Sequence, residues 1–276
     1  MYVGLLTARF AKDKPFEEIA EWAAGAGYTA LEVTSGPDGH IRPAEVLADG
    51  GAAVKKVLEK TGLKISSLTL YRGVKPGTKE ADEYVEDFKE VLKAAEALGV
   101  DVVCTLAGFP AEGKDKMTTI KEDLPGLFGP LGEEAAKRGV KIAFENCWAF
   151  NLQNLDHFAA AMEVLPESIG LNYDPSHLYW QKLDYLAAVD EFGSRIYHTH
   201  AKDTTENEAA LKRIGVLERG WWRYSIPGTG GIDWSEYTDR LKSVGYDGVL
   251  SVEHEDKQFT PEEGFEKAIE HLSQFV

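Results

Sequence analysis

The stretch Y-H-T-H-A-K-D at residues 197–203 ends a short predicted strand in two histidines, a lysine and an aspartate. Side chains alternate between the two faces of a strand, so His198 and His200 would lie on the same face. Two imidazoles on one face at a strand end indicate a metal site or a proton-transfer site. Hydrogen-bonded core histidines are the alternative, and the ends of the other strands decide between these interpretations.

On both sides of this stretch, short apolar segments alternate with longer amphipathic ones, which is typical of βα units and a parallel sheet. Together these units occupy residues 1–276 without a linker, so the sequence predicts a single-domain (β/α)8 TIM barrel with its site at the C-terminal strand ends. A doubly wound open sheet is the alternative, but residues 7–10 (TARF) lack the glycines of a phosphate loop. The predicted strands span 3–8, 30–34, 64–70, 100–106, 140–144, 169–173, 196–199 and 248–252, and the predicted helices 15–25, 43–61, 80–98, 118–138 (interrupted), 155–165, 183–192, 234–244 and 261–275.

The composition is that of a soluble globular protein, with 43% hydrophobic and 28% charged residues. The net charge of −16 excludes a basic surface and so argues against nucleic acid or an anionic membrane as a partner. The N-terminal residues 1–6 resemble a first strand rather than a signal peptide, and no apolar run approaches the roughly 18 residues that span a bilayer. Cys104 and Cys147 are expected to be free thiols, which favours the cytoplasm.

Four consecutive predicted strands carry a metal-binding side chain at their ends: Glu145, Asp174, His200 and Glu253. The first three are separated by 29 (145 to 174) and 26 (174 to 200) residues, close to one βα repeat, and the last step of 53 (200 to 253) includes a long connection. Three carboxylates and one imidazole suit a hard divalent ion, and we expect one Mn²⁺, with Mg²⁺, Co²⁺ or catalytic Zn²⁺ as alternatives. Unrelated acids at the rim of an acidic protein are the competing interpretation.

The chain resembles the xylose-isomerase-like TIM-barrel superfamily of sugar isomerases and epimerases along its whole length. The resemblance rests on G-Y-T-A-L-E (27–32), F-E-N (144–146), D-P-S-H (174–177), H-T-H-A-K-D (198–203), I-P-G-T-G-G-I-D-W (226–234) and V-E-H-E-D (252–256). It implies that Glu145, Asp174, His200 and Glu253 are the metal ligands and that His177 binds substrate. Residues 202–203 and 227–234 look closer to the inosose isomerases and dehydratases than to ketose 3-epimerases. The AP endonucleases of the superfamily do not fit the acidic charge.

The predicted function is that of a metal-dependent isomerase or epimerase acting on a keto-sugar, an inosose or a related small polyol ketone. Such an enzyme needs a Lewis acid that stabilises an enediolate, and a base near the α-proton. Glu145 and Glu253 would form the acid/base pair that flanks the reacting carbon. A lyase or dehydratase would use the same enediolate and a general acid such as His198, His177 or Lys202. A sugar-binding barrel without catalytic activity is the third alternative.

Further residues are assigned to the substrate: Glu32 at the end of the second strand, Lys202 and His198, while Asp203 is the alternative partner for Lys202. The connection at about 204–232, between the seventh strand and the seventh helix, is long enough to be a lid. Its R-G-W-W-R-Y segment could cover a sugar ring with Trp222 while Arg223 hydrogen-bonds hydroxyl groups. The same tryptophans are equally consistent with the interface of a homo-oligomer.

Overall fold

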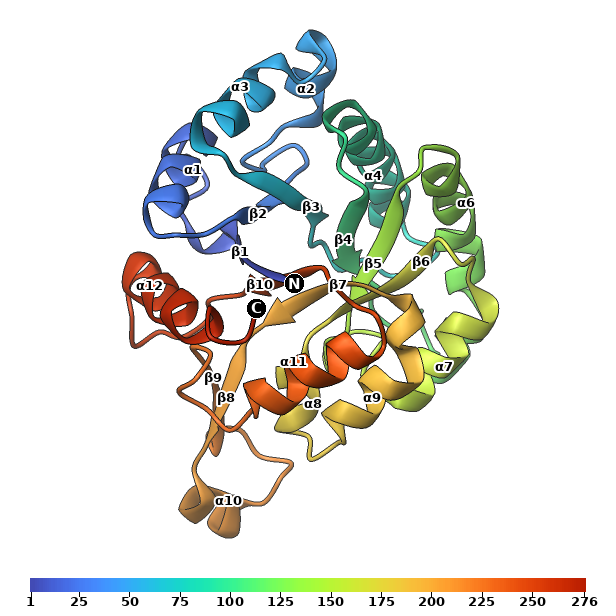
Figure 1. Ribbon diagram of the computed structural model, residues 1–276. Coiled ribbons are helices and arrows are strands. Elements are labelled where there is room, and N and C mark those ends of the chain that lie inside the picture. The colour runs from blue at the N-terminus through green and yellow to red at the C-terminus, as the bar shows by residue number, and fades with distance from the viewer.

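The protein forms a closed barrel of eight parallel strands in the computed structural model, which describes residues 1–276 (Figure 1). Each strand pairs with its neighbours in sequence, and β1 closes the ring by pairing with the last barrel strand, β10. The predicted TIM barrel is therefore confirmed. The barrel strands are β1 (Tyr2–Leu6), β2 (Ala30–Thr34), β3 (Lys64–Leu70), β4 (Val102–Leu106), β5 (Lys141–Glu145), β6 (Ile169–Tyr173), β7 (Ile196–Ala201) and β10 (Val249–Val252).

Helices surround the barrel and follow the predicted order, with α8 and α10 as additional short helices (Figure 1). The helix predicted over 43–61 is broken in two, because Gly50 and Gly51 both adopt positive φ angles of 66° and 78°, which end one helix and begin the next. The region predicted over 118–138 divides at Asp123. The helices are α1 (Phe16–Gly25), α2 (Pro43–Asp49), α3 (Ala52–Thr61), α4 (Lys79–Leu98), α5 (Lys116–Glu122), α6 (Leu124–Lys137), α7 (Leu155–Val164), α8 (Pro175–Tyr179), α9 (Tyr185–Phe192), α10 (Glu208–Ile214), α11 (Trp234–Ser243) and α12 (Pro261–Leu272).

The hydrophobic core fills the space between the barrel and its helices. Phe128 of α6 packs edge-on against Phe144 of β5, with ring centroids 4.7 Å apart, and both side chains are fully buried. No helix is both long enough and apolar enough to cross a membrane. The core thus packs the helices against the outside of the barrel. The C-terminal ends of the strands can then carry polar side chains.

Two glycines of α6 are expected to respond oppositely to replacement by alanine. A Cβ at Gly132 would lie 2.9 Å from Ile169 Cδ1 and 3.1 Å from Ser168 Oγ, so Gly132→Ala should destabilise the fold by about 1–3 kcal/mol through overpacking. Gly126, in the first turn of the same helix, has open space at that position, and Gly126→Ala should stabilise by about 0.5–1 kcal/mol. Urea unfolding of both variants measures the difference, and equal effects would contradict this packing.

The long connection after β7 is folded rather than irregular. β8 (Asp203–Glu206) pairs antiparallel with β9 (Trp222–Ser225), and α10 lies between them. The Asp203 carboxylate holds the base of this hairpin, because it accepts hydrogen bonds from several donors of the connection. These donors are the backbone N–H groups of Thr204, Gly228, Gly230 and Ile232 and the indole Nε1 of Trp234.

Candidate functional site

The four predicted metal ligands converge at the C-terminal end of the barrel. Glu145 ends β5, Asp174 follows β6, His200 lies on β7 and Glu253 follows β10, and one ligand atom of each lies within 4.8 Å of all the others. His200 Nδ1 is 3.1 Å from Glu253 Oε2, 3.7 Å from Glu145 Oε1 and 3.8 Å from Asp174 Oδ2. The parallel strands thus bring together side chains that are far apart in the sequence.

The chemistry of this cluster fits a divalent ion. Asp174 Oδ2 and His200 Nδ1 are buried and lack a hydrogen bond of good geometry, and their nearest charged neighbours are Lys202 Nζ at 3.2 Å and Glu253 Oε2 at 3.1 Å. A divalent ion among the four side chains would give both atoms a direct partner. Glu145, Asp174, His200 and Glu253 could therefore hold one ion through three carboxylates and an imidazole, a donor set suited to Mn²⁺, Mg²⁺, Co²⁺ or Zn²⁺.

The exposure of the four side chains differs in a way that defines the approach to the cluster. Asp174 and His200 are fully buried, whereas the side chains of Glu145 and Glu253 are 8% and 15% exposed. A substrate would therefore meet the two glutamates first.

The two glutamates also differ in their electrostatic surroundings. Burial raises the pKa of Glu253, and the neighbouring Lys202 ammonium offsets this only in part. Burial likewise opposes ionisation of Glu145, but the His177 and His200 imidazoles outweigh it and hold the pKa of this carboxyl well below its usual range. The surrounding side chains therefore favour the ionised form of Glu145 more strongly than that of Glu253.

The sequence analysis assigned Glu32 to the substrate. In the structure Glu32 lies on the side of His200 that faces away from the cluster. Its Oε2 is 3.1 Å from His200 Nε2, the ring nitrogen opposite to the one that faces the cluster. The carboxylate also accepts hydrogen bonds of 2.7 Å from Thr69, Tyr71 and Ser251, and it is fully buried. Burial would raise the pKa of Glu32, but the neighbouring histidines lower it below its ordinary value. Glu32 thus fixes the orientation of the His200 ring.

His198, for which the sequence left open a substrate contact or a hydrogen-bonded place in the core, lies deeper in the barrel than His200. Its Nδ1 contacts Asn172 Oδ1 at 2.9 Å and its Nε2 contacts Ser66 Oγ at 3.2 Å, and only 1% of the residue is exposed. Burial lowers the pKa of His198 to about 4, so the ring is neutral at pH 7. Its two ring nitrogens are thus both engaged inside the barrel.

Glu32, Cys104 and His198 form a second group of potential metal ligands inside the barrel. The carboxylate and the imidazole already have hydrogen-bond partners, and burial raises the pKa of the Cys104 thiol well above its usual range. The oxygen and nitrogen ligand atoms of this second group are thus already satisfied within the barrel.

Lys202, which the sequence analysis assigned to the substrate, borders the cluster of metal ligands. Its charged partners come from the ends of two other strands, β6 and β10. Its Nζ lies 2.5 Å from Glu253 Oε2, 3.0 Å from Glu255 Oε2 and 3.2 Å from Asp174 Oδ2. The predicted alternative partner, Asp203, is instead occupied by the 226–234 segment. Burial would lower the pKa of Lys202, but Asp174 and Glu253 raise it, so the ammonium stays charged.

His177, the substrate residue implied by the family resemblance, lies between the cluster and the hairpin. Its Nε2 is 3.1 Å from Glu145 Oε1 and its Nδ1 is 2.6 Å from the hydroxyl of Tyr224 on β9. Burial raises the pKa of Tyr224 to about 12, so this hydroxyl stays protonated, and it shares a hydrogen bond with His177 Nδ1. The sequence analysis included Tyr224 in the aromatic segment that could cover a sugar ring but did not predict its contact with His177, although alternation along β9 places Tyr224 and Trp222 on one face.

Trp222 and Arg223 belong to the wall beside the cluster. The Trp222 ring stacks on Trp180 with centroids 4.3 Å apart and lies 4.9 Å from the Tyr224 ring. Arg223 Nη1 instead donates to Asp256 Oδ2 at 2.6 Å, and this hydrogen bond holds the hairpin to the loop after β10. Trp222 is thus placed near Tyr224 and the site, whereas Arg223 is tied to the barrel rim.

Metal binding is expected to stabilise the fold, because the cluster exists only in the folded chain. After dialysis against EDTA, Mn²⁺ at 100 times its Kd should add about 2.7 kcal/mol to the free energy of unfolding. Differential scanning calorimetry measures the rise in Tm. Asp174→Ala should lose most of this rise, while the exposed control Glu112→Ala should keep it. The same rise in both variants would contradict the metal site.

A parallel barrel with its polar cluster at the C-terminal strand ends is the arrangement of TIM-barrel enzymes. The family model for the xylose isomerase-like TIM barrel matches residues 20–275, and the chain belongs to this family.

Proteins with similar sequences and structures include the following three. The uncharacterised protein YfiH of Bacillus subtilis is 28% identical and the match covers 95% of each chain. An inosose dehydratase of Glaesserella parasuis is 26% identical over 88% of this chain and 83% of its own. The crystal structure of the IolI protein with a bound zinc atom superposes with a TM-score of 0.76, at 22% identity, over 100% of this chain and 99% of the other, and shows the shared fold.

Proposed function

We propose that the protein is a divalent-metal-dependent isomerase or epimerase of a small carbohydrate ketone, such as a keto-sugar or an inosose. The observation that carries this proposal is the arrangement of Glu145 and Glu253. They are the only partly exposed members of the cluster and come from strand ends β5 and β10, on either side of Asp174 and His200. Two carboxylates that flank one substrate carbon can remove a proton from one side and return it from the other.

The proposed reaction begins with transfer of the α-proton to one of these carboxylates. The C–H bond breaks, and its electron pair moves into an enediolate that includes the former keto oxygen. The carboxylic acid of the other glutamate then returns a proton to carbon from the opposite face, which inverts that centre. A divalent ion held by Glu145, Asp174, His200 and Glu253 would supply the Lewis acidity that stabilises the enediolate charge. We propose Mn²⁺ as this ion.

Four neighbouring side chains would prepare the two glutamates and the substrate. Lys202 holds Glu253 through the 2.5 Å contact and presents a charged donor to substrate oxygens. His177 contacts Glu145 and is itself held by Tyr224, so the Glu145 carboxylate keeps one orientation. The aromatic rings of Trp222 and Tyr224 would pack against the apolar face of the substrate.

A dehydratase acting on the same class of substrate is the second candidate. The observation that favours it is the buried ammonium of Lys202, 2.5 Å from Glu253 and 3.2 Å from Asp174, because loss of a β-hydroxyl needs a proton donor close to the enediolate. The similarity to an inosose dehydratase over 88% of the chain supports this candidate as well. Of the three acids that the sequence offered for this step, Lys202 and His177 border the cluster and His198 does not.

Proton NMR in D₂O tests the two candidates directly. The metal-loaded protein is incubated with ketohexoses, inososes and keto-glycosides, with Mg²⁺ in place of Mn²⁺ where signals broaden. Deuterium next to the carbonyl together with an isomeric product is the expected result. Loss of water to an enone or diketone would instead establish the dehydratase. No exchange with any of these ketones, while metal is bound, would contradict both candidates.

A further inference from the structure

A cavity of about 270 Å³ lies at the ends of strands β1 and β10 and reaches one of the predicted metal ligands. Leu5 of β1 pairs with Val252 of β10, so the residues that follow these two strands are neighbours at the rim. Glu253, which we propose as one of the two acid/base residues, therefore lines the same cavity as Arg9. The other residues that line it are Leu6, Ala8, His254, Glu255 and Lys257.

Arg9 differs from the other arginines of the chain, because it is partly buried and its guanidinium has no partner. Arg195 donates to backbone carbonyls, Arg219 lies over the Trp148 ring, and Arg213 is exposed on α10. The Nε atom of Arg9 is buried and makes no hydrogen bond. An N–H group that is shielded from water costs free energy until an acceptor binds it. The remaining arginines all form ion pairs: Arg42, Arg72, Arg138, Arg223 and Arg240.

The backbone around Arg9 is held in place on both sides. Thr7 Oγ1 accepts a hydrogen bond of 3.1 Å from the Thr34 N–H, and the Phe10 N–H donates to the Thr7 carbonyl and closes the 3-10 turn η1 (Thr7–Arg9). The buried Phe10 ring stacks on Phe265 of α12, with centroids 5.4 Å apart. Arg9 thus starts from a fixed point of the rim, and a ligand does not have to order the turn that carries it.

The cavity holds two cations without counter-ions and two anions that already have one. Arg9 and Lys257 form no ion pair, whereas Glu253 and Glu255 both contact Lys202 Nζ, at 2.5 Å and 3.0 Å. The Arg9 side of the cavity is therefore locally cationic on a chain of net charge −16. A guanidinium binds a carboxylate or a phosphate through two parallel hydrogen bonds, so an anionic group is the acceptor that matches Arg9.

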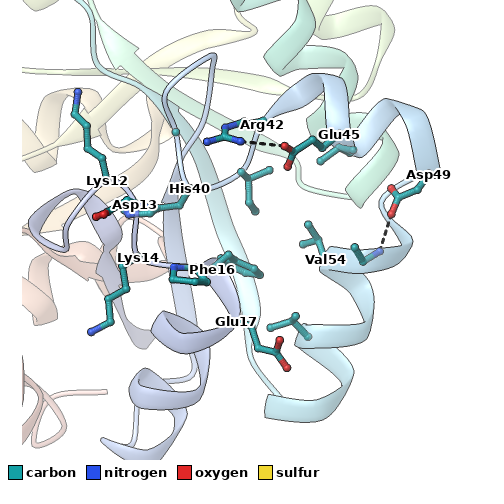
Figure 2. Close-up of a pocket in the computed structure, with 16 residues that line it drawn as sticks. Lys12, Asp13, Lys14, Phe16, Glu17, His40, Arg42, Glu45, Asp49 and Val54 are labelled. Atoms are coloured by element: carbon teal, nitrogen blue, oxygen red, sulfur yellow. Dashed lines mark hydrogen bonds and ion pairs between the residues drawn. The ribbon is translucent and has the colours of Figure 1, made fainter.

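Another cavity, between α1, α2 and α3, shows the contrast with an arginine that has an internal partner (Figure 2). It has a volume of about 340 Å³, and Arg42 Nη1 on its wall is 3.1 Å from Glu45 Oε1 (Figure 2). None of the four predicted metal ligands lines this cavity. It therefore offers a ligand neither an unpaired guanidinium nor contact with the proposed catalytic residues.

We propose that Arg9 binds an anionic group of the substrate, a carboxylate or a phosphate, in the cavity between the ends of β1 and β10. The group would lie on the Glu253 side of the reacting carbon, with the exposed Lys257 as a second, weaker contact. Arg9 is thus a specificity-determining residue that favours acidic carbohydrate ketones over neutral ones. This inference rests on the proposed function, since it takes Glu253 as a residue that meets the substrate.

Binding of three unreactive polyols to the Mg²⁺-loaded protein tests the proposal, with Kd values from ligand-observed NMR titrations. D-Glucitol is neutral, D-gluconate carries a carboxylate in place of one hydroxymethyl group, and D-glucitol 6-phosphate carries a phosphate. None of them has a keto group, so none is turned over. One of the anionic polyols is expected to bind about 10- to 100-fold more tightly than glucitol, and the tighter of the two identifies the anionic group. A chain of net charge −16 would otherwise favour the neutral polyol.

Arg9→Gln is expected to abolish this preference and to leave the Kd for glucitol within a few-fold of the wild type. Arg9→Lys keeps the charge but not the planar fork, so it should lower the preference several-fold, and it serves as the second variant if Arg9→Gln does not fold. Arg213→Gln is the matched control and should keep the full preference, because Arg213 is exposed on α10. The proposal is overturned if neither anionic polyol binds more tightly than glucitol, or if the preference is unchanged in the Arg9 variants because the anion binds elsewhere.

This result can be separated from that of the D₂O experiment. A preference that depends on Arg9, together with no proton exchange in any ketone, D-fructuronate included, would contradict the catalytic proposal and leave the anion site standing. Proton exchange in neutral ketones together with equal affinity for the three polyols would have the opposite meaning.

Discussion

Glu145→Gln is expected to lower kcat by about 10²- to 10⁴-fold, the usual contribution of general acid–base catalysis. The amide has nearly the shape of the carboxylate but cannot take up the α-proton. Glu253→Gln should lower kcat to a similar extent. The kcat of both variants is measured with the ketone that undergoes exchange in the NMR experiment, and elemental analysis reports the metal content.

The two variants should differ in proton exchange, which gives a sharper test than loss of activity alone. Each epimer presents its α-proton to one of the two glutamates, so the variant that keeps that glutamate should still exchange the proton for deuterium, whereas the other variant should not. Neither should form the epimer, because one face lacks its acid or base. Glu112→Gln, at a carboxylate that is 94% exposed, is the matched control and should keep the wild-type rate. Near-normal turnover in either variant with metal still bound would rule out the two-carboxylate mechanism.

Glu32→Gln is expected to weaken metal binding by about 10- to 100-fold, the typical effect of losing the residue that orients a metal-binding histidine. The amide removes the negative charge 3.1 Å from His200 Nε2 and leaves the four ligands themselves unchanged. Isothermal titration calorimetry with Mn²⁺ or Zn²⁺ measures the Kd.

Ser66→Ala provides the control for Glu32→Gln. Ser66 is also buried inside the barrel, but it contacts His198 and the Leu31 carbonyl instead of His200. Its replacement should leave the Kd for metal within a few-fold of the wild type. Equal weakening in both variants would mean that general loosening of the barrel, and not the Glu32–His200 contact, controls affinity.

The barrel could be predicted because its eight strands, and the helices that connect them, follow local hydrophobic periodicity, whereas the short elements α8, α10, β8 and β9 were not predicted. Proximity of Glu145, Asp174, His200 and Glu253 then followed, since equivalent positions on parallel strands meet at one rim. The break between α2 and α3 was missed because the amphipathic pattern continues through Gly50 and Gly51, although these two residues reverse the backbone.

The depth of a side chain inside the barrel could not be predicted from the alternation of side chains along a strand. His198 and His200 share a face, as predicted, but two residues along a strand correspond to roughly 6.6 Å. That difference buries His198 beside Ser66 and leaves His200 at the cluster. The partners of Lys202 and the contact of Tyr224 with His177 depend on how separate loops fold toward each other, and no local pattern encodes such distances.

The hydrogen-bond cluster around Asp203 isolates residues 207–221 from the four predicted metal ligands. Its carboxylate fixes the start of β8 and the 226–234 segment with donors that lie outside residues 207–221. Residues 207–221 therefore leave and rejoin the barrel between two anchored points, and lengthening a loop between fixed ends costs little free energy. An insertion or deletion within residues 207–221 is thus expected to be tolerated while Lys202 and its neighbours keep their positions.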